Sequence, residues 1–232
     1  MPADPDIGHV AAAIGQRARA TMLTALLGGA PVTVTELARA AGVSASTASL
    51  HLTRLASQHL VVAEPAGRER HYRLASPEVA EALEALQRIA EPPSVGSLSG
   101  ATAAERLRVA RSCYDHLAGR LGVAVTDALI ARGYLRSGSD AFDLTETGES
   151  WLRSLEVDVE ALRGQRRRFA PRCQDWSERR PHLAGALGAA LLQGFLERRY
   201  VTRRPRERAL RITPAGERAL RRELGIELPT TP

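Results

Sequence analysis

The chain is 232 residues long, 44% of them hydrophobic and 25% charged, and its formal net charge is +6. This composition agrees with a soluble protein that has one large or two small hydrophobic cores. No apolar run approaches the roughly 18 to 20 residues of a membrane-spanning helix. The opening residues, MPADPDIGHV, lack the basic and apolar segments of a signal peptide. We therefore expect a cytoplasmic protein without a membrane partner.

The first predicted elements are two helices separated by a glycine-rich break. Apolar residues at helical spacing predict a helix over 10–27, which residues 28–31 (GGAP) end. Thr33 and Glu36 form a T-x-x-E capping box, so a second helix should begin there. Gly42 can adopt the positive φ that ends this helix in a sharp turn.

A third helix should begin at Ser44, which can serve as its N-cap. Ala48, Leu52 and Leu55 recur at helical spacing and form its inward face. Small hydroxyl and basic side chains remain on the other faces, where they suit base edges and phosphates in the major groove. These side chains are Ser46, Thr47, Ser49, His51 and Arg54. The pattern predicts a recognition helix.

A basic β-hairpin is predicted after the recognition helix, because two extended runs flank the turn at 65–67. Arg68, Arg70 and Arg73 make this hairpin cationic. Arginines at such a hairpin suit phosphates or the negative potential of the minor groove. A helix-turn-helix followed by a basic wing predicts that the chain binds double-stranded DNA.

Residues from about 14 to 90 resemble the ArsR-type winged helix-turn-helix transcription regulators. The resemblance lies in the runs RARATMLTALLGG and ELARAAGVSASTASLHLTRL and in the wing ending HYRL. It implies a homodimer that represses transcription until a signal releases it. It also implies that Ser44, Ala45, Ser46, Ser49 and His51 face the DNA. The family's familiar metal-sensing members carry ligands in the helix before the recognition helix or after the wing, and here neither helix contains cysteine or histidine.

A helix that starts at Ser76-Pro77 follows the wing, and its apolar stripe includes Val79 and Leu83. In the ArsR family this helix pairs with its twin across a dimer axis. The proline-rich stretch after it reads as a linker. We therefore predict a DNA-binding and dimerisation domain over 1–90, a linker over 91–101, and an effector domain over 102–232.

The effector domain contains an internal repeat. His116 begins the run HLAGRLGVA, and His182 begins the similar run HLAGALGAA. The likeness continues through two short strands into a helix capped by threonine, over about 116–152 and 182–220. The predicted fold class is therefore mainly α with small β-hairpin wings: an N-terminal winged helix-turn-helix and a C-terminal region of two degenerate winged-helix-like repeats.

Both cysteines lie in this region, each near a histidine. We expect Cys113 and His116 one turn apart on a helix that Thr102 and Glu105 cap, whereas Cys173 precedes His182 by nine residues. Three interpretations remain open. In the first, the cysteines and histidines form a soft-metal site, although their spacing matches no closed zinc pattern. In the second, the thiols sense redox state. In the third, all four residues only pack in the core.

The effector is not fixed by the sequence, and an aromatic pocket is a further candidate. Tyr114, Trp176, Phe195 and Tyr200 either line a site for an apolar ligand or belong to the core. No G-x-S-x-G, phosphate loop or H-E-x-x-H occurs, so we expect no catalytic residues, no enzyme and no organic cofactor. The sequence predicts a homodimeric repressor with a C-terminal sensor; an adaptor that recruits a protein partner is the alternative.

Overall fold

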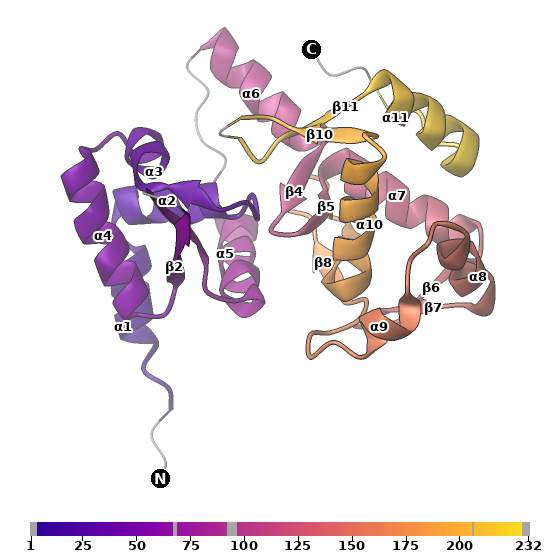
Figure 1. Ribbon diagram of the computed structural model, residues 1–232, viewed down its shortest axis with the longest axis horizontal. Helices are drawn as coiled ribbons and strands as arrows, with labels where there is room; N and C mark the ends of the chain where they lie inside the picture. The colour runs from indigo at the N-terminus through magenta and orange to yellow at the C-terminus, as the bar shows by residue number, and fades with distance from the viewer. Residues whose placement is uncertain (1–3, 67–68, 92–96, 206, 229–232) are drawn as a thin grey trace. The chain divides into compact units, whose positions relative to one another are not determined.

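The computed structural model describes residues 4–66, 69–91, 97–205 and 207–228 (Figure 1). The chain divides into two compact units, Met1–Leu86 and Gln87–Pro232. No helix among the residues that the structure describes is long and apolar enough to cross a membrane.

The N-terminal unit is a winged helix-turn-helix. Its elements are α1 (Ile7–Ile14), α2 (Arg17–Leu26), β1 (Val32–Thr33), α3 (Val34–Ala41), α4 (Ala45–Ser57), β2 (Val61–Ala66), β3 (Glu69–Leu74) and α5 (Pro77–Ile89), which runs past the boundary between the units. The three strands form an antiparallel sheet in the order β1-β3-β2. Helices α2, α3 and α4 pack together over a leucine core, in which Leu23, Leu37, Leu52 and Leu55 are fully buried.

Local sequence explains the boundaries of these helices. The capping box of Thr33 and Glu36 is present, and Gly42 ends α3 with a φ of 65°. The expectation of a single first helix over 10–27 is wrong. Gly15 ends α1, and the Gln16 side chain then accepts a hydrogen bond from the Arg19 amide to start α2, so the chain changes direction between two short helices.

The C-terminal unit begins with α6 (Leu98–Val109) and then passes twice through the same order of hairpin, long helix, hairpin and helix. The first pass is β4 (Arg111–Cys113), β5 (His116–Ala118), α7 (Gly119–Ala131), β6 (Leu135–Ser137), β7 (Phe142–Leu144) and α8 (Glu146–Ser154). After α9 (Val159–Arg163), the second is β8 (Arg172–Gln174), β9 (Pro181–Leu183), α10 (Gly185–Glu197), β10 (Val201–Arg203), β11 (Leu210–Ile212) and α11 (Pro214–Ala219), which continues as a π-helical turn, Leu220–Leu224.

The two passes interlock through their first hairpins. Helix α7 packs on β9 and α10 packs on β5, so each long helix contacts the hairpin that precedes the other one. The Leu183 amide, for example, donates to the Thr126 hydroxyl at 2.9 Å. The core of this unit is built from both passes and includes Leu121, Leu129 and Leu187. Neither pass therefore buries its apolar face alone.

Two predictions for the start of this unit are wrong. Cys113 and His116 do not lie on a helix capped by Thr102 and Glu105, because α6 ends at Val109 and these two residues form a cross-strand pair of the β4–β5 hairpin. The cap of α6 is Ser97, whose hydroxyl accepts from the Gly100 amide, so this helix begins inside the linker predicted over 91–101. Linker residues 92–96 lie outside the described part of the chain.

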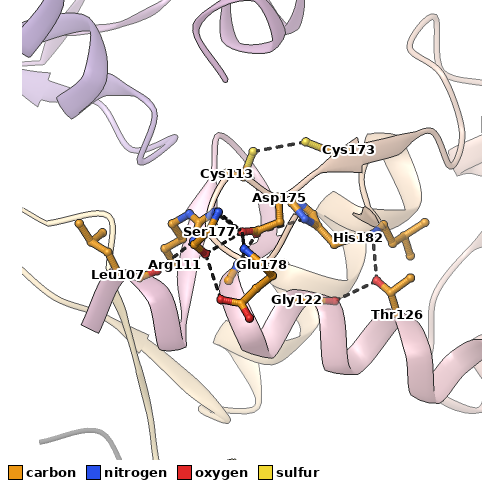
Figure 2. A network of polar contacts seen from close by, with 12 residues as sticks. Leu107, Arg111, Cys113, Gly122, Thr126, Cys173, Asp175, Ser177, Glu178 and His182 are labelled. Atoms are coloured by element: carbon orange, nitrogen blue, oxygen red, sulfur yellow. Dashed lines mark hydrogen bonds and ion pairs between the residues drawn. The ribbon is translucent and has the colours of Figure 1, made fainter. Parts of the chain in front are cut away.

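A buried ion pair joins the two first hairpins (Figure 2). The Arg111 guanidinium on β4 donates to the Asp175 carboxylate, just after β8, at 2.9 Å, and both side chains are 0% exposed. Asp175 also accepts from the Gly119 amide at 2.7 Å and from the Ser177 amide at 2.9 Å. Burial alone would raise the pKa of Asp175, but Arg111 holds this pKa well below its usual range. The carboxylate is therefore charged when the unit is folded.

Asp175→Asn should destabilise the C-terminal unit by about 3 to 5 kcal/mol, because it leaves the Arg111 charge buried without a counter-ion. The matched control is Asp127→Asn. It removes an exposed ion pair with Arg180, and such pairs contribute only about 0.2 to 1 kcal/mol. Denaturant unfolding followed by tryptophan fluorescence measures this unit selectively, since Trp151 and Trp176 are the only tryptophans. Equal midpoints for the two variants would contradict the prediction.

Candidate DNA-reading head and cysteine–histidine cluster

The N-terminal turn of α4 presents polar side chains. Ser44 caps the helix by accepting from the Thr47 amide at 3.1 Å, and its hydroxyl also contacts the Ser46 and Thr47 hydroxyls at 2.9 and 2.8 Å. The structure places most of the predicted DNA-facing residues on the exposed side of α4, and Thr47 and His51 are half-buried. The exposed ones are Ser44, Ala45, Ser46, Ser49 and Arg54.

Sequence reasoning missed one residue of this face. Leu50 is 73% exposed, although it is a large apolar side chain in the middle of α4. Its position supplied the signal, because Leu50 falls outside the inward spacing of Ala48, Leu52 and Leu55. An apolar side chain on a recognition helix is suited to the methyl group of thymine.

The wing is the β2–β3 hairpin, whose register pairs Glu64 with His71 and Pro65 with Arg70. Arg70 is exposed near its tip. Arg73 is not a free cation, because its guanidinium forms an ion pair with Glu64. Arg68 lies outside the described residues. Glu64 therefore already neutralises part of the positive charge that Arg73 brings to the wing.

A second candidate site lies in the C-terminal unit. There the structure brings together two cysteines and two histidines that come from two separate segments of the sequence. Cys113 pairs with His116 across β4–β5, and Cys173 pairs with His182 across β8–β9. One potential ligand atom from each of the four residues lies within 4.8 Å of those of the others. The two sulfur atoms face each other at 3.8 Å (Figure 2).

Each histidine ring of this cluster lies beside a carboxylate. His116 Nδ1 lies 3.3 Å from the Asp115 carboxylate, and His182 Nδ1 lies 3.3 Å from the Asp175 carboxylate. The ring centroids are 5.1 Å apart. His116 and His182 are only 7% and 1% exposed, and three of their ring nitrogens, both Nε2 atoms and Nδ1 of His182, are buried without a hydrogen-bond partner in the described part of the chain.

These contacts change the pKa values of the cluster. Burial would lower the pKa of His116, but the neighbouring Asp115 and Cys173 side chains raise it to about 9. The neighbouring Cys113 thiol lowers the pKa of Cys173, against the effect of burial, and His116 and His182 lower it further. Such surroundings favour a thiolate, the form of cysteine that binds metals and reacts with oxidants.

The four aromatic residues do not line a common pocket. Phe195 and Tyr200 contact each other edge to face and line a hollow with Trp151. Trp176 instead lies under the Arg111 guanidinium, 4.4 Å from its ring centroid. Tyr114 occupies the β4–β5 turn with a φ of 58°.

Comparison with known proteins covers both units. A family model described as a helix-turn-helix domain matches residues 14–63. Over 225 residues, the chain is 38% identical to the uncharacterised HTH-type transcriptional regulator YdfF of Bacillus subtilis (strain 168), covering 97% of this chain and 100% of YdfF.

Two solved structures are similar to part of this chain. NolR from Sinorhizobium fredii is 27% identical, with a TM-score of 0.34 over 38% of this chain and 95% of NolR. The homodimeric winged helix-turn-helix domain of Mb0332 from Mycobacterium bovis, a possible ArsR-family regulator, is 28% identical, with a TM-score of 0.33 over 38% of this chain and 87% of that domain. Because YdfF matches almost the whole chain and α3 and α4 lie inside the matched domain, the chain belongs to the HTH-type transcriptional regulators and carries a DNA-binding winged helix-turn-helix.

Proposed function

We propose that this regulator is a homodimeric repressor that binds a pseudo-palindromic operator in cytoplasmic DNA and releases it when an effector acts on the C-terminal unit. The observation that carries the proposal is the capped, exposed first turn of α4, followed in the chain by a basic wing. A helix N-terminus with small side chains can approach base edges closely.

Exposed apolar side chains support the dimer. Ile7 on α1 and Ile89 on α5 are 78% and 82% exposed, and Val10 and Leu86 on the same helices are 39% and 43% exposed. Burying such residues against a second copy would remove this apolar surface from water. The two-fold symmetry of a dimer would present two copies of α4 to two half-sites of DNA.

We also infer that the C-terminal unit arose by duplication of a winged-helix-like segment. Two matched features support this. Gly119 and Gly185, the glycines of the two HLAG runs, both start a long helix with φ values of 72° and 70°. Thr145 and Thr213 both cap the last helix of their segment by accepting from a glycine amide at 3.0 Å.

If the protein is a dimer, Ile89→Asp should shift it toward the monomer. The variant should also no longer protect paired half-sites of DNA, which are spaced by about one helical turn, roughly 34 to 36 Å. A charge there would be costly to bury in the interface. Leu98→Asp is the control, because Leu98 is 90% exposed on α6, which the proposal leaves outside the interface. Sedimentation equilibrium and footprinting measure the two effects. A wild-type monomer, or an Ile89→Asp dimer as tight as wild type, would overturn the dimer.

The wing predicts that Arg70→Ala reduces the slope of log affinity against log salt by about 1, because one phosphate contact is lost. Arg73→Ala should change the slope less, since Arg73 is paired with Glu64. Fluorescence anisotropy with operator DNA at several salt concentrations measures these slopes. Arg163→Ala, in the C-terminal unit, serves as the control. An unchanged slope in the Arg70 variant would remove the wing from the interface.

The recognition helix predicts that Ser49→Ala alters sequence preference rather than general affinity. Loss of a base contact should cost about 1 to 3 kcal/mol at one operator position. Ser57→Ala is matched to it, because Ser57 is exposed at the far end of α4 and its hydroxyl donates to the Arg54 carbonyl. Selection from randomised operators compares the two variants. Identical preferred sequences for Ser49→Ala and wild type would exclude this position from base readout.

A further inference from the structure

The cysteine–histidine cluster has the composition and size of a single-ion site. Two sulfur and two imidazole donors from Cys113, His116, Cys173 and His182 lie within 4.8 Å of one another. A tetrahedral ion with metal–sulfur bonds of about 2.3 Å holds its two sulfur atoms about 3.8 Å apart. The Cys113 and Cys173 sulfur atoms are 3.8 Å apart.

The orientation of the histidines points to the same use. Each ring has its Nδ1 beside a carboxylate, Asp115 for His116 and Asp175 for His182, at 3.3 Å. Metal-binding histidines commonly direct one nitrogen to a carboxylate while the other coordinates the ion. The Nε2 atoms of both rings, and Nδ1 of His182, are buried without a hydrogen-bond partner among the described residues, so an ion would satisfy one polar atom on each ring that otherwise remains unpaired.

We propose that Cys113, His116, Cys173 and His182 bind one thiophilic divalent cation of the zinc type in a closed tetrahedral site. Tetrahedral S₂N₂ coordination selects Zn²⁺ and related ions rather than Mg²⁺ or Ca²⁺, which prefer oxygen. Two thiolates neutralise the charge of such an ion. Four protein ligands leave no open position, so the site holds structure rather than catalysing a reaction.

The cluster also allows a competing chemistry, in which the two thiols lose two electrons and two protons to an oxidant and form a Cys113–Cys173 disulfide. The histidines argue against this as the main use of the site. A thiol pair needs neither two buried imidazoles nor their carboxylates, whereas an ion uses all four donors. The metal site requires no DNA binding, so it stands or falls separately from the proposed repressor function.

Cobalt provides the direct test, because tetrahedral Co²⁺ with thiolate ligands has intense visible bands and a near-ultraviolet charge-transfer band. The full-length protein, reduced and stripped of metal by a chelator, should bind one Co²⁺ per chain with this spectrum, and one equivalent of Zn²⁺ should displace it. Thiol titration should show both cysteines protected from modification when Zn²⁺ is present.

The ligand variants are Cys113→Ser and His182→Gln, and each should lower Co²⁺ affinity at least 100-fold. His59→Gln, an exposed histidine of the N-terminal unit, is the matched control and should bind as wild type does. Asp115→Asn should lower affinity about 10-fold and keep the four-ligand spectrum, because Asp115 only positions His116. Tryptophan fluorescence of each metal-free variant establishes that the C-terminal unit is folded.

Three outcomes would overturn the site: no tetrahedral Co²⁺ spectrum in the reduced wild type, an unchanged spectrum in Cys113→Ser, or a disulfide whose reduction leaves the protein unable to bind Co²⁺. If a ligand variant does not fold, the wild-type spectrum and its loss on thiol alkylation decide the question. Operator binding is measured separately, and a failure there leaves the metal result standing.

Discussion

The buried pair of Arg111 and Asp175 is the constraint on which the C-terminal unit depends. Two charges that are 0% exposed are tolerated only where their hydrogen bonds are nearly complete. Asp175 meets this condition by accepting from Gly119 at the start of α7 and from its own turn after β8. One carboxylate thereby fixes the β4–β5 hairpin, the first turn of α7 and the β8–β9 hairpin in a single arrangement, and it also lies beside His182.

Packing against the long helices explains why two short hairpins, with three residues per strand, hold their register. A two-stranded hairpin of this length is marginal in water. Here each one packs against the helix that follows the other hairpin, and the glycines that start those helices have no space for a side chain. A Cβ on Gly119 or Gly185 would lie 2.5 Å or 2.4 Å from a backbone oxygen. The HLAG runs therefore mark two positions of the unit where the backbone approaches too closely for any side chain.

The sequence predicted the winged helix-turn-helix well, because its signals are local: a capping box at Thr33, a positive-φ glycine at Gly42 and periodic leucines. It failed at Cys113 and His116, where the neighbouring residues also suit a helix. The hairpin forms because β4 pairs with β5 and also contacts residues about a hundred positions away, as when the Ser112 amide donates to the Arg208 carbonyl. Such contacts leave no signal in the neighbouring sequence. The spacing of the cysteines and histidines along the chain therefore could not predict that all four come together.

The interlocked hairpins also determine how a bound ion would affect the C-terminal unit. Each hairpin supplies one sulfur and one imidazole across a single strand pair, which is half of a tetrahedral shell. Neither half can hold the ion by itself, so ion binding and the packing of the two hairpins are one equilibrium. An ion in the site would add to the stability of the joined state that the Arg111–Asp175 pair already supports, and its loss would weaken the packing of the two hairpins on α7 and α10. An effect of the ion on operator binding would begin from that change, because the two metal sites familiar in the ArsR family have no cysteine or histidine here.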